Sequence, residues 1–340
     1  MAASSTLSGA AIAAVAMAVP DRRVSNREIA AGMGVDEGWI TKRTGTRERP
    51  WAEPGERMSD FAARAGREAL RAAGLDAEQL DLVLVATSTA DEITPNAAPL
   101  VAGQIGARSA GAFDVGAACT GWLAALAIAS GQIEAGRATH ALVIGADFLS
   151  RFLDFADRDT ASLFADGAGA AVVSSAPADA GRVGRVVLGS DVSGADLIRL
   201  ERSGRIEMRG QETFRAAVTA LTQVSEQALK ANDVQLDEID LFVYHQANSR
   251  IIRAVGQRLG LAADRVVDYV GRFANSSTAT LPIALSVARE EGRLKRGDRV
   301  LLAAFGGGFT WGATVITWDP PVPPGSGGAG VAANGADRRA

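Results

Sequence analysis

The sequence predicts a mixed α/β protein made of two similar halves that pack together. Short strands rich in Val, Leu and Ala alternate with helical stretches, a pattern that favours a sheet covered by helices on both faces. An internal repeat also relates the first part of the chain to the second. We therefore expect one half at residues 1–175, another at 176–318, and a tail at 319–340.

The repeat rests on two pairs of segments. REALRAAGLDAEQLDLVLVATS, from Arg67, and EQALKANDVQLDEIDLFVYHQA, from Glu226, each predict a helix, an acidic loop and a buried strand. Their matched residues are Leu70, Leu80, Asp81 and Leu82 in the first and Leu229, Ile239, Asp240 and Leu241 in the second, a constant offset of 159. Strands expected at 140–146 and 299–305 match at nearly the same offset. We interpret this as an internal duplication of about 150 residues.

Neither end of the chain predicts a membrane anchor. Residues 1–19 are apolar but hold no positive charge, so we predict a first strand there and not a signal peptide. No later stretch offers the roughly 20 uninterrupted apolar residues of a membrane span. Residues 319–340 are rich in Pro and Gly with little to bury, and we expect a disordered tail. The expectation is a soluble, cytoplasmic protein.

Charge and rare residues exclude several classes of function. The formal net charge of -4 leaves no basic excess that would suit nucleic acid or an anionic membrane. The chain has one Cys and two His, which are too few for an internal disulfide or a convincing metal cluster. We expect no metal and no redox cofactor.

The single cysteine, Cys119, lies where a strand at 113–115 gives way to an apolar helix. A helix N-terminus would favour the thiolate and lower the pKa of this thiol, and small neighbours such as Gly116 and Gly121 would let a substrate approach. The alternative is a buried structural cysteine that packs as a small apolar side chain.

A nucleophilic cysteine needs partners for proton transfer, and the histidines are His140 and His245. His245 follows the buried strand LFVY and precedes a helix that Asn248 and Ser249 could start. It therefore lies at the carboxyl end of a strand, where α/β proteins place active sites. A satisfied core histidine is the alternative. His140 opens a strand after a polar loop, which indicates a surface position.

Two further motifs contain candidate functional groups. Asn275 opens a Ser/Thr-rich turn before a helix near Leu281. The offset of the repeat places Asn275 close to the position that corresponds to Cys119. The turns that contain Asn275 and Cys119 should therefore meet across a pseudo-twofold axis. An ordinary turn or N-cap residue is the alternative. Three glycines follow Phe305, and their N–H groups could face a ligand oxyanion, although a plain glycine-rich turn fits as well. Neither a phosphate-binding loop nor a dinucleotide fingerprint is present.

Six motifs resemble, in order and spacing, those of the β-ketoacyl-acyl-carrier-protein synthase III family. They are AACTG around Cys119, HQAN from His245, FANSS around Asn275, FGGGFTWG from Phe305, WITKRTGTRER from Trp39 and FADGAGAAVV from Phe164. The resemblance covers residues 7–318. It implies a thiolase-like fold, in which two pseudo-duplicated halves form an α-β-α-β-α arrangement of layers.

The resemblance also implies roles for the candidate residues. Cys119 would take an acyl group from acyl-CoA, while His245 and Asn275 would hydrogen-bond the thioester carbonyl of a malonyl-carrier protein as it loses carbon dioxide. The N–H groups of Cys119 and Gly307 would hold the tetrahedral oxyanion, and Phe305 would keep water from the acyl-enzyme. Acyl-CoA and malonyl-carrier protein would be substrates, with no cofactor.

Other residues match the family's substrate-carrier contacts. The matching positions are Trp39 and Arg158 for the adenine of CoA, Arg43 for its diphosphate, Gly210 and Asn248 for the pantetheine tunnel, and Arg250 for docking of acyl-carrier protein. A homodimer is also implied. The segment 190–208 is shorter than in typical members and borders the tunnel entrance. Thr94 stands where some members place a Phe that closes the acyl pocket across the dimer interface, so a longer or branched starter could fit.

Several functions remain open at this point. The leading one is condensation of a starter acyl group with a malonyl unit, in fatty-acid initiation or polyketide priming. An alternative acyltransferase would pass the acyl group from the cysteine to an alcohol or amine without forming a carbon–carbon bond. A carrier-binding scaffold without catalytic activity is the third possibility.

Overall fold

The structure is a computed structural model that describes residues 9–177 and 182–320. Two sheets form its framework. The first has the order β1-β7-β6-β4-β5, formed by β1 (Gly9–Ala18), β7 (Asp166–Ala176), β6 (His140–Phe148), β4 (Leu82–Ala86) and β5 (Gly111–Val115). The second has the order β11-β12-β13-β8, formed by β11 (Leu241–Tyr244), β12 (Arg299–Gly306), β13 (Thr310–Thr317) and β8 (Val187–Ser190). The parallel pairs are β4 with β5 and β6 in the first sheet, and β11 with β12 in the second.

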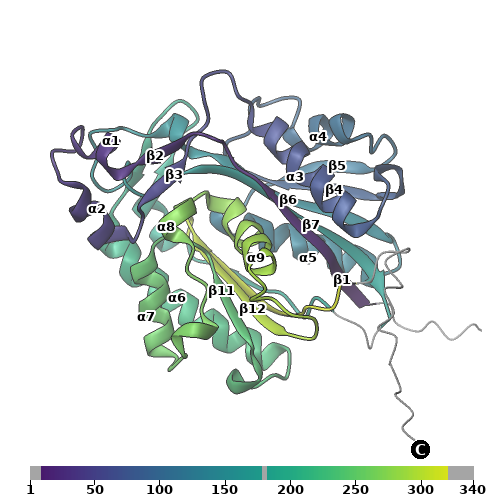
Figure 1. Ribbon diagram of the computed structural model, residues 1–340. Coiled ribbons are helices and arrows are strands. Elements are labelled where there is room, and N and C mark those ends of the chain that lie inside the picture. Colours follow the sequence, from purple (N-terminus) through teal and green to yellow (C-terminus); the bar gives the residue numbers. More distant parts are fainter. Residues whose placement is uncertain (1–8, 178–181, 321–340) are drawn as a thin grey trace, which may run out of the picture.

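Helices cover both faces of both sheets (Figure 1). The outer helices are α3 (Met58–Ala73) and α4 (Ala97–Ile105) on the first sheet, and α6 (Gly210–Ala231) and α7 (Ser249–Arg258) beside the second. Between the sheets lie α5 (Gly121–Glu134) and α9 (Thr280–Glu290), and α9 contacts β1 and β7 of one sheet and β11 of the other. The predicted α-β-α-β-α order of layers is confirmed.

The central helices are buried because their sequences are apolar on all sides. In α9 every residue from Thr280 to Ala288 is buried, and α5 buries Trp122, Leu123 and Leu126. A helix without a polar face must be covered all round, which the two sheets achieve here. The turns that precede these helices, with Cys119 and Asn275, are therefore held firmly in the interior.

The internal duplication is visible element by element. The strands β4 and β11 begin at Leu82 and Leu241, which are 159 residues apart, and the same offset relates Gly121 of α5 to Thr280 of α9. Two aspartates at equivalent positions even make the same bonds, since Asp81 accepts from the N–H of His140 and Asp240 from that of Arg299. The boundary between residues 175 and 176 stays a prediction.

Smaller elements complete the described chain. They are β2 (Arg23–Ser25), α1 (Asn26–Ala30), α2 (Glu37–Thr44), β3 (Glu48–Pro50), β9 (Ile198–Leu200), β10 (Ile206–Met208) and α8 (Val270–Phe273). The predicted first strand is present as β1, antiparallel to β7. The predicted tail lies outside the described residues from 321 onward. Among residues 9–177 and 182–320, no helix is both long and apolar enough to cross a membrane.

Candidate active site

Cys119 lies in a 3-10 turn, Ala118–Thr120, that joins β5 to α5. Ala118 has a φ of 45°, which is unusual for a residue with a Cβ. Hydroxyl groups hold the turn, because Thr120 Oγ1 donates to the Ala117 carbonyl at 2.7 Å. Gly306 of β12 packs directly beneath it, where a Cβ would come within 2.7 Å of the Cys119 nitrogen. A strand of the second half of the chain therefore packs directly against the cysteine turn of the first half.

Three donors surround the sulfur of Cys119. The Ser277 hydroxyl lies 3.5 Å from Sγ, and the backbone N–H groups of Cys119 and Gly307 favour the thiolate. Burial nevertheless raises the pKa of the thiol to about 11, because loss of hydration outweighs the donors, and the buried Asp147 carboxylate adds to the rise. The predicted low thiol pKa is therefore wrong. The same donors remain suited to an oxyanion that forms next to the sulfur.

The turn of the second half is a copy of the cysteine turn. Ser277 has a φ of 50°, opens the 3-10 turn Ser277–Ala279 and follows Ala118 by 159 residues. Asn275 precedes it, and its Oδ1 accepts the Ser277 N–H at 2.9 Å, which leaves Nδ2 as the donating end of the amide. The predicted meeting of the two turns is confirmed by the contact between Ser277 and Cys119.

The side chain of Asp147, at the end of β6, forms hydrogen bonds with residues of both halves. Its fully buried carboxylate accepts from the Ser88 N–H, from the hydroxyls of Thr87 and Thr89, and from both the N–H and the hydroxyl of Thr278. Burial raises the pKa of this group, and the hydrogen bonds oppose the rise. By the offset of 159, Thr278 is the counterpart of Cys119. One copy of the turn thus directs an N–H group to the Asp147 carboxyl group, and the other directs it to the Cys119 sulfur.

His245 directly follows β11, as predicted, and the residue is only 3% exposed. The Nδ1 atom lies 2.6 Å from Thr280 Oγ1, at the start of α9. Burial lowers the pKa of the imidazole to about 3, so His245 is neutral at physiological pH. Together with Asn275 it supplies uncharged hydrogen-bonding groups beside Cys119.

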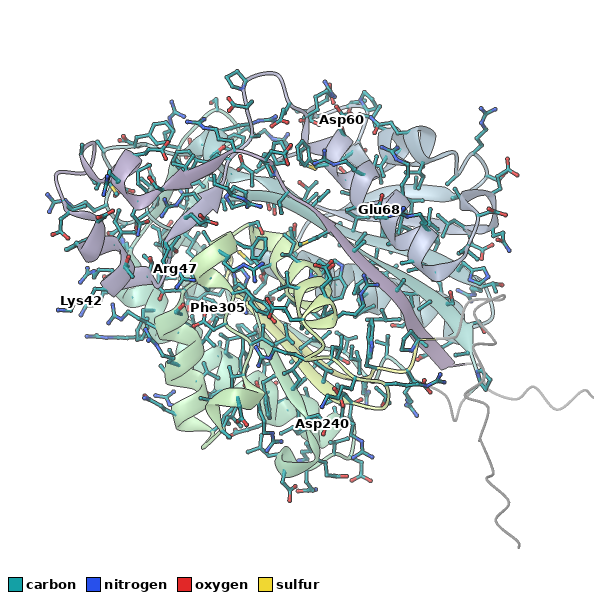
Figure 2. The ribbon with its side chains drawn as sticks, in the orientation of Figure 1. Lys42, Arg47, Asp60, Glu68, Asp240 and Phe305 are labelled. Carbon is teal, nitrogen blue, oxygen red and sulfur yellow. The ribbon has the colours of Figure 1, made fainter. Side chains whose placement is uncertain are left out.

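These residues share one cavity of about 510 Å³. The predicted residues that line it are Cys119, His245, Asn275, Phe305, Trp39, Arg43, Arg158, Gly210, Asn248 and Arg250. His245, Asn275 and Phe305 are buried, whereas Arg43, Arg158 and Arg250 are exposed, so the cavity runs from an apolar interior to a basic mouth. Figure 2 shows Phe305 inside the molecule and Lys42, the neighbour of Arg43 on α2, at its edge.

Two predicted residues are not part of the cavity lining. The N–H of Gly307 faces the Cys119 sulfur, while Thr94 is exposed next to Ile93.

His140 is half-buried and not at the surface as predicted, because its Nδ1 lies 2.9 Å from Ser174 Oγ within the sheet. Ser174 is the neighbour of His140 across the antiparallel pair β6–β7, and sequence periodicity gives no such pairing.

The mouth of the cavity is braced by interactions between distant segments. Arg158 donates from Nε to the Met33 carbonyl at 2.8 Å, and the Arg43 guanidinium lies 5.2 Å from the Trp39 ring centre. Asn248 caps α7, and its Nδ2 donates to the Arg43 carbonyl at 3.2 Å. The arginines and Trp39 are thereby held in place around the entrance.

The segment at 190–208 forms one wall of this cavity. It turns back on itself as the antiparallel pair β9–β10, in which Ile198 faces Met208, and both residues line the cavity. Arg209 closes the hairpin by donating its N–H to the Leu197 carbonyl at 2.9 Å. The compact hairpin places apolar side chains between the cysteine and the mouth.

Sequence reasoning missed Ser277, Asp147 and Thr280. Ser277 was detectable, since the offset of 159 pairs it with Ala118 beside the cysteine. Asp147 lies near the end of an apolar strand, where no local pattern distinguishes it. Thr280 gives no local signal because its partner, His245, is 35 residues away.

Comparisons with known proteins match this chain to one family. Models of the family "3-Oxoacyl-[acyl-carrier-protein (ACP)] synthase III" match residues 113–192, and those of its C-terminal part match 229–318. The chain is 43% identical over 308 residues to a β-ketoacyl-[acyl-carrier-protein] synthase III of Rhizorhabdus wittichii, covering 88% of this chain and 97% of the relative.

Solved structures give the same result. The 3-oxoacyl-[acyl-carrier-protein] synthase III of Aquifex aeolicus superimposes with a TM-score of 0.88 at 38% identity, covering 91% of this chain and 100% of that one. A priming β-ketosynthase from the R1128 polyketide biosynthetic pathway also gives 0.88, at 34% identity over 92% of this chain and 97% of that one.

Proposed function

The chain belongs to the 3-oxoacyl-[acyl-carrier-protein] synthase III family, and from this premise we propose that Cys119 carries a starter acyl group for condensation with a malonyl thioester. The protein is a condensing acyltransferase with the thiolase-like fold of that family. One observation carries the proposal. Cys119, His245 and Asn275, from different parts of the chain, line the same cavity.

In the first half-reaction, Cys119 Sγ attacks the thioester carbonyl of acyl-CoA. The oxyanion of the tetrahedral intermediate accepts hydrogen bonds from the N–H groups of Cys119 and Gly307, which are already directed at the sulfur. Collapse of the intermediate forms the new thioester and releases CoA. Because burial disfavours the free thiolate, the thiol proton must leave as the bond to the carbonyl forms, and it departs with the CoA thiol.

In the second half-reaction, the thioester carbonyl of malonyl-carrier protein accepts hydrogen bonds from His245 and Asn275. The bond to the free carboxylate breaks, carbon dioxide leaves, and the electron pair forms an enolate that the two donors stabilise. The enolate carbon attacks the acyl-Cys119 carbonyl, and the cysteine leaves as the β-keto product forms. Uncharged donors suit this step, because a cation would stabilise the malonyl carboxylate before it reacts.

The buried surroundings favour the same step. Phe305 is 5% exposed and packs against Phe309, with 4.6 Å between the ring centres. An apolar wall next to the sulfur excludes water from the acyl-enzyme and disfavours the carboxylate relative to neutral carbon dioxide. We assign Phe305 to this role.

The basic mouth suits thioester carriers with phosphate groups. Trp39 and Arg158 would hold the adenine of CoA and Arg43 its diphosphate, while Gly210 and Asn248 would flank the pantetheine arm. Arg250 is exposed at the mouth, its guanidinium 5.2 Å from the Phe214 ring centre, where it would meet an acidic acyl-carrier protein.

A homodimer in the cytoplasm completes the proposal. The strand β5 is the outer strand of its sheet, and Phe113 in the middle of it is 43% exposed. Ile93, in the loop before α4, is 72% exposed. An exposed strand edge with large apolar side chains suits pairing with a second copy of the chain. Thr94, beside Ile93, would then border the acyl pocket of the partner and leave room for a longer or branched starter.

Release of labelled carbon dioxide tests the condensation. Wild-type protein receives a starter acyl-CoA and a malonyl-carrier protein labelled at its free carboxyl carbon, and we expect equal amounts of carbon dioxide and β-ketoacyl product. His245→Ala should lower the rate on the order of 100-fold, the typical effect of removing one oxyanion donor. His140→Ala is the matched control, because that ring lies outside the cavity. Transfer of the acyl group without carbon dioxide would instead support the alcohol or amine acyltransferase.

A further inference from the structure

The hydroxyl of Thr280 has two acceptors for one proton. Its Oγ1 lies 2.6 Å from His245 Nδ1 and 3.0 Å from the Ser277 carbonyl oxygen. Thr280 and His245 are each 3% exposed, so water does not compete freely for these groups. A neutral imidazole also carries a single ring proton, on either Nδ1 or Nε2. The direction of the Thr280 hydroxyl therefore decides which ring nitrogen of His245 is a donor.

The two arrangements differ in what they offer a substrate. If Thr280 donates to Ser277, the ring proton must lie on Nδ1, and Nε2 becomes a bare acceptor that repels a carbonyl oxygen. If Thr280 donates to Nδ1, the ring proton lies on Nε2, which can then donate to the oxygen of the developing enolate. Decarboxylation needs the second arrangement.

The surroundings favour that second arrangement. The Ser277 carbonyl already accepts the backbone N–H of Thr280, so it does not depend on the hydroxyl. The contact with Nδ1 is also the shorter of the two, 2.6 Å against 3.0 Å. We propose that Thr280 is a positioning residue that donates to His245 Nδ1 and thereby fixes the Nε2-protonated tautomer for decarboxylation.

The duplication shows that this pair is not required by the fold. The counterparts of His245 and Thr280, 159 residues earlier, are Ala86 and Gly121. They are neighbours as well, because a Cβ on Gly121 would lie 3.2 Å from the Ala86 Cβ. The same two positions therefore meet in both halves, but only the second half places polar side chains there. The hydroxyl–imidazole pair belongs to the chemistry of the second half.

Because His245 is neutral, its tautomer decides whether Nε2 can donate a hydrogen bond. Burial lowers the pKa of the ring to about 3, so a second ring proton is absent near pH 7. A doubly protonated ring would donate from both nitrogens whatever Thr280 did. With one proton only, the partner at Nδ1 determines the function of Nε2.

Nitrogen NMR of the protein labelled with 15N-histidine measures the tautomer directly. With only two histidines in the chain, the spectrum is simple, and His140→Ala assigns it. We expect the His245 proton on Nε2 in wild-type protein and in Thr280→Ser, with Nδ1 shifted as a hydrogen-bond acceptor. In Thr280→Val that acceptor shift should disappear. A proton on Nδ1 in the wild-type protein would overturn the inference without the need for any variant.

Kinetics provide the second readout. This inference rests on the proposed condensation, so we expect Thr280→Val to lower kcat for carbon dioxide release about 10-fold or more, with little change in KM and normal acylation of Cys119. Thr280→Ser should restore most of the rate. Thr222→Val is the control, since it removes a buried hydroxyl from α6 that bonds the Val218 carbonyl.

The outcomes separate the two claims. Wild-type carbon dioxide release that Thr280→Val leaves unchanged contradicts the role of Thr280. Absence of release from the wild-type protein contradicts the proposed condensation, while the NMR result on the tautomer keeps its meaning.

Discussion

Cys119 lies among hydrogen-bond donors, but its pKa is raised. The Ser277 hydroxyl and two backbone N–H groups act in favour of the thiolate, while burial acts more strongly against it. These donors therefore contribute most when negative charge develops on a substrate oxygen during the reaction, which is where they lower the barrier. Reactivity depends on the geometry around the sulfur more than on a resting thiolate.

Alkylation of this cysteine by iodoacetamide should report the raised pKa. With a thiol pKa of about 11, the thiolate fraction and the alkylation rate should rise about 10-fold per pH unit from pH 7 to 9.5, without a plateau. Intact-mass measurement of the rate is unambiguous, because the chain has one cysteine. The urea-unfolded protein is the control and should begin to level off near pH 8.5, the ordinary thiol value. A plateau near pH 7 in the folded protein would contradict the raised pKa.

The sequence predicted the positions of the candidate site residues but not their electrostatic state. Cys119, His245 and Asn275 follow strands or open turns that local patterns reveal, so their positions were predictable. The pKa of Cys119 was not, because it depends first on the burial of the thiol and then on Asp147, which lies elsewhere in the chain. The partner of His245, Thr280, likewise becomes visible only once α9 is packed against the end of β11.

At the scale of elements, two copies of one turn have diverged. The turns Ala118–Thr120 and Ser277–Ala279 share a first residue with positive φ, and each precedes a central helix. In the first copy the next residue is the cysteine. In the second copy it is Thr278, whose N–H and hydroxyl are taken up by Asp147. The carboxylate thus anchors the second turn against the first sheet and holds Ser277 beside the sulfur.

Asp147→Ala should destabilise the protein by about 3 kcal/mol or more, because it leaves several buried donors without an acceptor. The free energy of unfolding in urea measures the loss. Asp60→Ala is the control, since Asp60 is an exposed residue of α3 (Figure 2), and its removal should change stability by less than about 0.5 kcal/mol. Equal stability of the two variants would show that Asp147 does not anchor the turn.

Local patterns predicted the strands and helices that flank the candidate site, and the offset of 159 residues predicted which of them correspond between the halves. The strands expected at 140–146 and 299–305 are β6 and β12, and the helix expected near Leu281 is α9. The meeting of the two turns was predicted, but side-chain partners between the halves, such as Asp147 with Thr278, were not predictable from one sequence. They depend on the register with which the second half packs on the first, and no local pattern encodes that register.

At the scale of the whole molecule, the duplication creates the site. Each half brings a buried central helix and the turn before it to the middle layer (Figure 1). Cys119 and Asn275, which precede these helices, both line the cavity. In the proposed mechanism, the first half supplies the nucleophile and the second supplies the decarboxylation donors. The exposed edge at β5 and Ile93 offers a surface for a second copy of the chain, which would add Thr94 to the acyl pocket.

Intact-mass spectrometry after exposure to a panel of acyl-CoAs tests the central claim, that Cys119 carries the acyl group. We expect one added acyl group, located on Cys119 by digestion, and more modification by hexanoyl-CoA than by acetyl-CoA because Thr94 is small. Cys119→Ala should show no adduct and no condensation. An acyl group on another residue, or full activity of Cys119→Ala, would contradict the account.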